Sequence, residues 1–338
     1  MTAPRFDLFG IGNAIVDVLA RAEDDFLVAE GMAKSSMALI DEARAQALYG
    51  KIGQTVLVSG GSAANTCVGA AMLGARVAFA GKVRDDELGR SFIHDIRAAG
   101  VAFDVPPATD GLSTASCTIL VTPDGERTMN TFLGASQNLG PDDIDASQVA
   151  DSAITYLEGY LWDPPAAKAA FRRAAEIAHG AGRTVALSLS DLFCVDRHRP
   201  EFLELLKSGT VDVVFANEAE AKSLAETSDL KSAIGVLRDL ARIAVITRSE
   251  DGAVITEGST IVAVPAHPIE RIVDATGAGD LYAAGFLTGL GRGFSLEDCA
   301  RLGALAAAEV IQHMGARPQA DLKALAAEEG IALAPEVA

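Results

Sequence analysis

The stretch DVVFANEAEAKSLAE, residues 212–226, contains the strand and helix unit that decides the fold. Its first part is an apolar run of strand length, and the part after Asn217 is rich in Ala and Glu, which favour a helix. Val213, Val214 and Phe215 follow one another without a polar residue, so both faces of this strand are expected to be buried. Strands of this kind belong to parallel sheets that helices cover on both sides.

The same alternation of apolar and amphipathic runs continues on both sides of this unit. The further strands expected are 153–159, 184–190 and 243–248, and the helices expected are 165–182 and 200–209. The second of these helices would begin at a Pro and end at a Gly, a common pairing. After them, 252–258 and 259–266 predict a hairpin, and the Ala-rich region 277–312 predicts helix. The pattern predicts an α/β fold, a three-layer αβα sandwich around a mostly parallel, Rossmann-like sheet.

The first third of the chain is less regular. Strands are expected at the start of 5–22 and at 76–83, and helices at 60–75 and 86–100. The segment 117–133 is typical of two strands around the turn Pro123-Asp124-Gly125. We expect these β segments to form a small accessory sheet beside the parallel core.

Composition limits the classes of partner. The chain has 338 residues and a net charge of −18, so a broad nucleic-acid interface is not expected, and an anionic ligand must be held by local groups. It contains no apolar run of membrane-spanning length and no basic and apolar leader at its start. Its four cysteines lack metal spacing. We expect a cytoplasmic protein with small-molecule partners and neither a nucleic-acid nor a membrane partner.

The motif DATGAGD, residues 274–280, lies directly before an expected helix. Unpaired amide groups at Gly277, Ala278 and Gly279 would form an anion-binding turn that the helix dipole favours. Asp280 would repel a phosphate, but it is suited to remove a proton from a hydroxyl that attacks phosphorus. Taken alone, the motif is equally well explained as a Gly-rich turn with a favourable acid at a helix start.

The motif GGSAANT, residues 60–66, follows another expected strand. Gly60 and Gly61 permit close approach to the backbone, and Asn65 offers both a donor and an acceptor, which suits a polyol. The alternative is a plain strand-to-helix turn in which Ser62 caps the helix. A nucleophile elbow is not supported, because Ala64 occupies the position of its last Gly.

The motif GIGNAIVD, residues 10–17, fails as a dinucleotide fingerprint because Ile15 replaces the third Gly. Asn13 and Asp17 are instead polar groups at the end of an apolar strand. Asp17 is a candidate bidentate acceptor for two vicinal hydroxyls. The alternative is a surface Asp on an alternating strand.

The motif NEAE follows the strand in the opening unit. Asn217 and Glu220 share one face of a helix start, at the sheet edge where parallel α/β folds bind ligands. They are candidates for organising hydrated Mg²⁺ beside phosphates. The alternative is a helix capping box. The five histidines lack metal spacing, and no Walker A sequence is present.

These four stretches, which occur in order along nearly the whole chain, resemble the ribokinase-type (PfkB) family of carbohydrate and nucleoside kinases. GGSAAN and DATGAGD resemble its two signatures, and NEAE resembles its N-x-x-E motif. The chain departs from the usual D-T-x-G-A-G-D at Ala275, although Thr276 follows at once. Within the family, GNAIVD and GGSAANT are most similar to the adenosine kinases.

The resemblance implies a ribokinase-like core with a small β-sheet lid over the substrate. The expected core is 1–12, 45–103 and 134–338, and the expected lid is 13–44 and 104–133. The implied activity is ATP-dependent phosphorylation of the 5′-hydroxyl of a ribonucleoside, foremost adenosine to AMP. ATP and Mg²⁺ are the implied cofactors, with K⁺ as a further candidate.

The resemblance also assigns roles to residues. Asp280 is implied to be the general base, and Gly277, Ala278 and Gly279 the anion hole. The implied substrate-binding residues are Asn13, Asp17, Gly60, Gly61, Ser62, Asn65 and the lid arginine Arg127. The implied ATP-binding residues are Asn217, Glu220, Thr247, Arg248, Gly252, Thr276 and Gly279. Glu220 is implied to hold Mg²⁺ through water, and Asp274 is a candidate ligand of a monovalent cation.

Other interpretations stay open at this point. A free-sugar kinase similar to ribokinase or fructokinase, or an inosine or guanosine kinase, would use the same chemistry. A non-catalytic nucleoside-binding protein is a more distant alternative, since the base Asp280 is intact. Met37, Leu133, Tyr160 and Trp162 are candidates to stack a nucleobase and equally good core residues. The chain is expected to act as a monomer or a homodimer.

Overall fold

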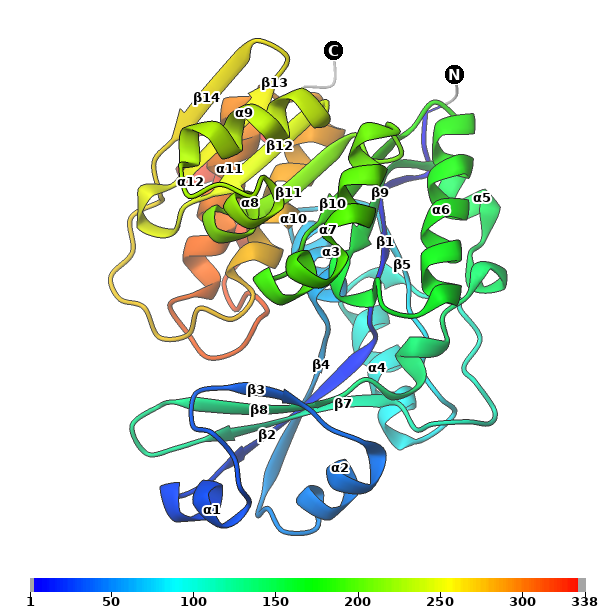
Figure 1. Ribbon diagram of the computed structural model, residues 1–338, viewed down its shortest axis with the longest axis vertical. Helices are drawn as coiled ribbons and strands as arrows, with labels where there is room; N and C mark the ends of the chain where they lie inside the picture. The colour runs from blue at the N-terminus through cyan, green and yellow to red at the C-terminus, as the bar shows by residue number, and fades with distance from the viewer. Residues whose placement is uncertain (1–2, 334–338) are drawn as a thin grey trace.

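The computed structural model describes residues 3–333, which form a large and a small sheet (Figure 1). The large sheet is parallel from β6 to β12 and is extended by the antiparallel β13 and β14. Its strands, in spatial order, are β14 (Thr260–Val264), β13 (Ala253–Glu257), β12 (Ile243–Thr247), β11 (Val213–Asn217), β10 (Thr184–Ser188), β9 (Ser152–Glu158), β1 (Phe6–Ile11), β5 (Val77–Ala80) and β6 (Val101–Ala102). The predicted hairpin at 252–266 is confirmed.

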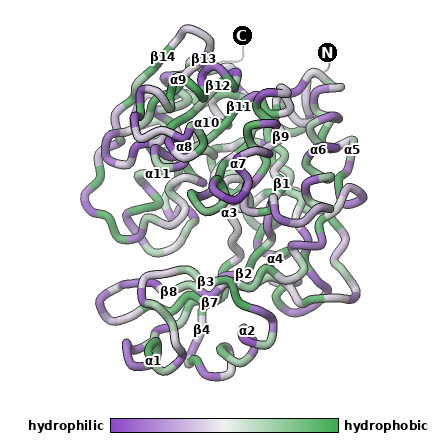
Figure 2. Tube along the Cα trace, in the orientation of Figure 1, coloured by the Kyte–Doolittle hydropathy of each residue, from purple (hydrophilic) through white to green (hydrophobic). Residues whose placement is uncertain are grey.

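Helices cover both faces of this sheet, which confirms the predicted αβα sandwich (Figure 1). One face is covered by α6 (Pro165–Gly180), α7 (Leu192–Lys207), α8 (Glu218–Leu224) and α9 (Leu230–Leu240), and the other by α3 (Ser62–Met72), α10 (Ala278–Gly291) and α11 (Leu296–Val310). The remaining core helices are α4 (Glu87–Ala98), α5 (Ala146–Ala150) and α12 (Leu322–Glu328). Hydrophobic residues follow the core strands, and hydrophilic residues lie in the surface loops (Figure 2).

Small residues let α3, α10 and α11 pack closely, as the Ala-rich sequence suggests. A Cβ added at Gly69 of α3 would lie 2.5 Å from the Leu281 side chain of α10. A Cβ at Gly285 of α10 would overlap the carbonyl group of Leu302 in α11. Close packing of this kind fixes the start of α10 against the rest of the core.

The small sheet forms a separate layer with its own helices, α1 (Asp24–Ala29) and α2 (Glu42–Tyr49). We call this unit the lid. Its strands, in spatial order, are β3 (Met37–Leu39), β8 (Arg127–Phe132), β7 (Ala115–Val121), β2 (Ile15–Arg21) and β4 (Thr55–Gly60). Its own buried apolar cluster contains only Ala20, Leu27 and Leu120 among the described residues. The lid therefore has little hydrophobic core of its own.

The expected boundary between core and lid needs one correction. Residues 45–60 were expected in the core, but 45–49 belong to lid helix α2, and 55–60 form β4, which pairs antiparallel with β2 at the edge of the lid sheet. The strand pattern alone does not show this, because pairing depends on contacts between distant segments. The segment 5–22 likewise gives two strands, β1 and β2, in different sheets. Residues 1–2 and 334–338 of the expected core lie outside the described part of the chain.

One predicted helix begins well before its expected start. The helix expected at 200–209 begins at Leu192, where the Asp191 side chain accepts a hydrogen bond from the Cys194 amide. Pro200 lies inside this helix rather than at its start. The capping bond and the packing of α7 outweigh the one backbone bond that Pro removes. Within residues 3–333, no helix is long and apolar enough to cross a membrane.

Candidate active site

Asp280 lies in the first turn of α10, at the point where two distant motifs meet. Its Oδ1 accepts a hydrogen bond from Ser62 Oγ at 2.6 Å, and its Oδ2 accepts one from Asn65 Nδ2 at 3.1 Å. Ser62 was also considered as a helix cap, but Gly61 is the capping position and makes no side-chain cap bond. The side chains of Ser62 and Asn65, from the motif GGSAANT, thus orient the carboxylate of Asp280, from the motif DATGAGD.

The surroundings of Asp280 adjust its acidity. Burial raises its pKa from 3.8 to about 6, while the hydrogen bonds from Ser62 and Asn65 oppose that rise. A carboxylate with this pKa is mostly ionised at neutral pH, yet it is more basic than an exposed Asp. Both properties suit a general base.

The turn before Asp280 has the backbone shape of an anion-binding turn. Gly277 has φ 82°, and a Cβ there would lie 2.9 Å from Ala316, so only Gly fits. The Ala278 amide donates to the Ala275 carbonyl at 3.2 Å. The amides of Gly279 and Asp280 belong to the first turn of α10, where a helix supplies no acceptor of its own. These two amides are the better candidates for an anion hole.

Asp17 brings a second carboxylate to the site from lid strand β2. A Cβ at Gly60 would lie 2.6 Å from Asp17 Oδ2, so the Gly leaves room for this carboxylate. Burial raises the pKa of Asp17 to about 7, Arg317 and Arg127 lower it, and Asp280 raises it. The charges of Asp17 and Asp280 therefore interact across the boundary between lid and core.

The expected substrate contact of Asn13 is not what the structure shows. Asn13 is 1% exposed. Its backbone amide and its Nδ2 both donate to Glu158 Oε1, and its Oδ1 accepts from Ser136 Oγ. Asn13 supports the site from within, and sequence analysis did not identify its partner Glu158.

Arg127 and Asp274 were assigned to a substrate site and a cation site, but they pair with each other. Arg127 Nη2 lies 2.8 Å from Asp274 Oδ2, and the two side chains are 10% and 5% exposed. Asp274 also accepts hydrogen bonds from Thr276 Oγ1 at 2.7 Å and from the Gly315 amide at 2.8 Å. Donors thus surround this carboxylate, which does not fit a monovalent cation bound there.

On the expected nucleotide side, Asn217 and Glu220 form the capping box that the sequence left as an alternative. The Asn217 amide donates to Glu220 Oε2 at 2.9 Å, and Asn217 Oδ1 accepts from the Glu220 amide at 2.9 Å. Glu220 is buried, which raises its pKa to about 7.

A magnesium ion would need ligands besides Glu220. No group of three or more His, Cys, Asp or Glu within the described residues could hold a metal ion. The residues present fit a Mg²⁺ ion that Glu220 would contact through water. Phosphate oxygens would then be its main ligands, as is usual for Mg²⁺ in kinases.

The other nucleotide-side residues lie in one row across the sheet. Register places Asn217 beside Thr247, Thr247 beside Ala253, and Ala253 beside Val264. Arg248 follows Thr247 and pairs with Glu218 and Asp251, and a Cβ at Gly252 would overlap the Val264 carbonyl.

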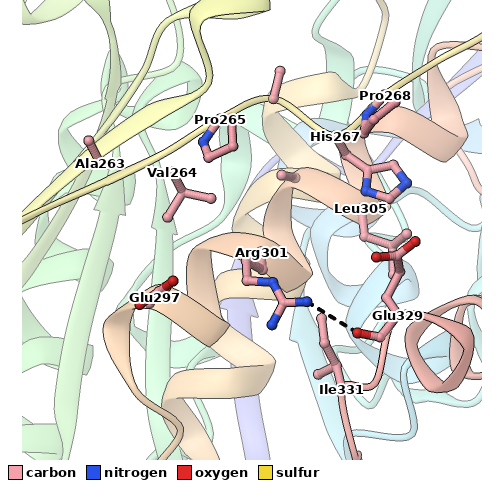
Figure 3. Close-up of a pocket in the computed structure, with 12 residues that line it drawn as sticks. Ala263, Val264, Pro265, His267, Pro268, Glu297, Arg301, Leu305, Glu329 and Ile331 are labelled. Carbon is pink, nitrogen blue, oxygen red and sulfur yellow. Dashed lines mark hydrogen bonds between the residues drawn. The ribbon is translucent and has the colours of Figure 1, made fainter.

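A cavity of about 280 Å³ continues this row (Figure 3). The loop after β14 lines one side, including Pro265 and His267, and helix α11 lines the other through Ala304 and Leu305. Arg301 closes the far end and donates to the Glu329 carbonyl at 3.1 Å. This cavity was not predicted from the sequence, because its walls come from three separate segments, 263–268, 297–305 and 329–331, that carry no motif.

Aromatic side chains lie beyond the carboxyl ends of β9 and β10. Tyr160 is 36% exposed and close enough to Asp280 that this carboxylate contributes to the raised pKa of its phenol. Phe193, which sequence analysis missed, is 57% exposed. Met37 is also exposed, and Leu133 is half-buried. Trp162, by contrast, is fully buried between Phe171 and Phe202 and is a core residue rather than a ligand contact.

An αβα core with a β-sheet lid, a buried carboxylate at a helix start and a Gly-rich turn before it is an arrangement typical of ATP-dependent phosphotransferases that act on small molecules. A family model described as pfkB family carbohydrate kinase matches residues 33–322, and the chain belongs to this family. Sequence relatives and solved structures agree with this class, which confirms the predicted enzyme class.

Three similar proteins narrow the range of activities. Adenosine kinase from Saccharomyces cerevisiae is 28% identical, with 93% of this chain and 96% of the relative covered. The structure of adenosine kinase from Sinorhizobium meliloti is 53% identical with a TM-score of 0.90, covering 96% and 99% of the two chains. That of a probable sugar kinase from Rhizobium etli CFN 42 is 50% identical with a TM-score of 0.91, covering 97% and 100%. The chain is a nucleoside or sugar kinase.

Proposed function

We propose that this kinase transfers the γ-phosphoryl group of ATP to the 5′-hydroxyl of adenosine, giving AMP. The observation that carries the proposal is the Asp280 carboxylate, held by Ser62 and Asn65, with the partly exposed Tyr160 close enough to feel its charge. The similarity to two adenosine kinases over nearly the whole chain supports the same substrate.

In this proposal, residues of both the lid and the core bind the acceptor. Asp17 and Asn65 hold the ribose hydroxyls, because a carboxylate can accept from two vicinal hydroxyls and an amide can both donate and accept. Asp280 then removes the proton of the 5′-hydroxyl as that oxygen attacks phosphorus. Lid closure excludes water and so disfavours ATP hydrolysis.

The start of α10 stabilises the transferred group. The amides of Gly279 and Asp280 point out of the first turn and offer hydrogen bonds to the charge that develops on the phosphoryl oxygens. Bound Mg²⁺ would neutralise part of the phosphate charge. Thr247, Arg248 and Gly252 border the donor, and the cavity of Figure 3 at the end of their row would accept its base.

The preference for a nucleoside rests on Tyr160 and Phe193. Both are large apolar side chains exposed at the ligand-binding edge of the sheet, where a free sugar would leave them in water. A purine would cover them by stacking. Stacking contributes substantial binding energy for any nucleobase. A free-sugar kinase is the second candidate, since the 50% identical structure bears that name and Asp17 and Asn65 suit either acceptor.

A panel of acceptors separates these candidates. ATP-dependent phosphorylation is measured on adenosine, inosine, guanosine, ribose and fructose, with Mg²⁺ and with or without K⁺. We expect adenosine to have a kcat/KM at least tenfold above that of the next acceptor. Phe193→Ala should lower kcat/KM for adenosine but leave that for ribose unchanged. A free sugar as the best acceptor would overturn the substrate proposal and keep the role of Asp280.

A further inference from the structure

The chain passes between core and lid four times within residues 3–333, and a hydrogen-bond network around one buried carboxylate links three of these crossings. The first crossing is 12–14, between β1 and β2; the second is Gly61, between β4 and α3; and the fourth is Leu133, after β8. Glu158, at the end of core strand β9, lies among them and is 1% exposed.

Glu158 uses both of its oxygens in this position. Oε1 accepts hydrogen bonds from the Asn13 amide at 3.2 Å and from Asn13 Nδ2 at 2.6 Å, so it holds the first crossing. Oε2 accepts from the Ala63 amide at 2.8 Å, so it holds the start of α3 just after the second crossing. The fourth crossing joins through Ser136, whose Oγ lies 2.9 Å from Asn13 Oδ1.

Two glycines show how tightly these segments meet. A Cβ at Gly12 would overlap Glu158 Oε2, and a Cβ at Gly61 would overlap the Asn13 carbonyl oxygen. None of the ion pairs found within residues 3–333 involves Glu158, and the groups that lower its pKa are the neutral donors of Ala63 and Asn13, although a buried carboxylate is costly without a cation. A nonpolar side chain would fill the same space, but it could not accept hydrogen bonds from the two N–H groups of Asn13 and the amide of Ala63.

We infer that Glu158 is a positioning residue that fixes the lid to the core and thereby holds the acceptor site of Asp17, Ser62 and Asn65 around Asp280. This inference rests on the proposed kinase function for its consequence, but not for its geometry. Ala63 directly follows Ser62, and Asn13 lies four residues before Asp17. A displaced Glu158 would therefore move residues on both sides of the acceptor. The nucleotide-side row lies on β11–β14, which β10 and β9 separate from β1 and the first crossing.

Glu158→Gln tests the inference at nearly unchanged volume. A carboxylate offers only acceptors, whereas the amide of Gln places an NH₂ group against either the Asn13 donors or the Ala63 amide. One hydrogen bond of Glu158 is then replaced by two N–H donors that face each other, one from the introduced Gln side chain and one from Asn13 or Ala63. We expect KM for the acceptor to rise about tenfold or more, which corresponds to one unsatisfied buried donor, while KM for ATP stays within about twofold.

The same variant has a readout that needs no substrate. Hydrogen exchange of the ligand-free protein should be severalfold faster in lid strands β2 and β7 of Glu158→Gln, and unchanged in β10–β12. Asp212→Asn is the matched control, because Asp212 accepts from the Val185 amide and a His at the opposite edge of the core sheet. It should change neither KM nor lid exchange.

Ser136→Ala keeps the inference testable if Glu158→Gln does not fold. It removes one hydroxyl from the same network and should raise the acceptor KM by a smaller factor. When both variants fold, their combined effect on this KM should be less than the product of the single effects, since they act through Asn13.

Several outcomes would overturn the inference. These are an unchanged acceptor KM, equal rises in both KM values, or faster exchange over the whole core. A wild type that prefers a free sugar would refute the proposed substrate only, because KM is then measured with that sugar. A wild type without kinase activity on any acceptor would refute the proposed function, and hydrogen exchange would still decide the role of Glu158.

Discussion

The core and the lid supply different parts of the site by different physical means. Core strands are buried on both faces, and the packed helices α3 and α10 bring Ser62, Asn65 and Asp280 together. The lid has a small apolar cluster and exposes large apolar side chains such as Val56 and Leu39. The rigid part thus holds the acid that is expected to do chemistry, and the less stable part holds Asp17.

Buried polar contacts join the two parts, and Val16 of lid strand β2 also packs in the apolar cluster of the core. The Arg127–Asp274 pair joins lid and core on one side of the site, and the Glu158 network joins them at the crossings. Buried ion pairs contribute little net stability but fix geometry, since breaking one leaves a charge unpaired. The comparison therefore predicts that loss of the Asp280 carboxylate in the core affects turnover, while loss of the Asp17 carboxylate in the lid affects acceptor binding.

Asp280→Asn should have the largest effect. The amide keeps the shape of the side chain but cannot take a proton, so kcat is expected to fall by about a thousandfold or more with KM near normal. Steady-state assays of phosphoryl transfer measure both constants.

Asp298→Asn is the control for this substitution, because Asp298 occupies the first turn of the neighbouring helix α11 and is exposed. It should retain wild-type turnover. An Asp280→Asn enzyme with ordinary kcat would remove Asp280 from the mechanism and leave the core without an identified base.

Asp17→Asn should have a smaller effect of a different kind. It removes one charged acceptor from the ribose site, so kcat/KM for the acceptor is expected to fall about a hundredfold, mainly through KM, at unchanged KM for ATP. Asp25→Asn, an exposed acid in lid helix α1, is the control and should have no effect. A fall in kcat alone would contradict the division between core and lid.

The sequence was sufficient for the parts of the molecule that local pattern determines. Apolar runs alternating with amphipathic ones predict the parallel sheet, because both faces of each strand must be covered. The Gly-rich motifs before α3 and α10 predict where backbone must approach a ligand or another segment. Asn65 and Asp280 follow from these motifs and Asp17 from GIGNAIVD, and the structure places all three within one polar region.

What the sequence could not show depends on pairing between distant segments. Arg127 and Asp274 each suggest a ligand contact when considered alone, and only the fold shows that they satisfy each other. Glu158 ends an apolar strand without any motif, and Phe193 resembles a core residue of α7. Their roles come from burial and exposure, which are properties of the assembled chain.

The smallest predicted effect concerns stability, and it tests the buried carboxyls of the core and the lid together. Asp17, Glu158 and Glu220 have pKa values raised to about 7 by burial, and that of Asp280 is raised to about 6. The unfolded chain releases these protons near pH 4. Between pH 4 and 7 the folded protein thus binds more protons than the unfolded one, and stability falls as pH rises.

The unfolding temperature should therefore be higher at pH 6 than at pH 8, by roughly 5 °C for a chain of this size. Scanning calorimetry at both pH values measures the difference. Carboxyls whose pKa is lowered, such as Asp7 and Asp124, titrate below this window and do not contribute. Surface repulsion from the net charge would be screened by 0.5 M NaCl, whereas the buried groups would not. A difference that survives salt locates the effect at the buried carboxyls, and an unfolding temperature that rises from pH 6 to 8 would contradict it.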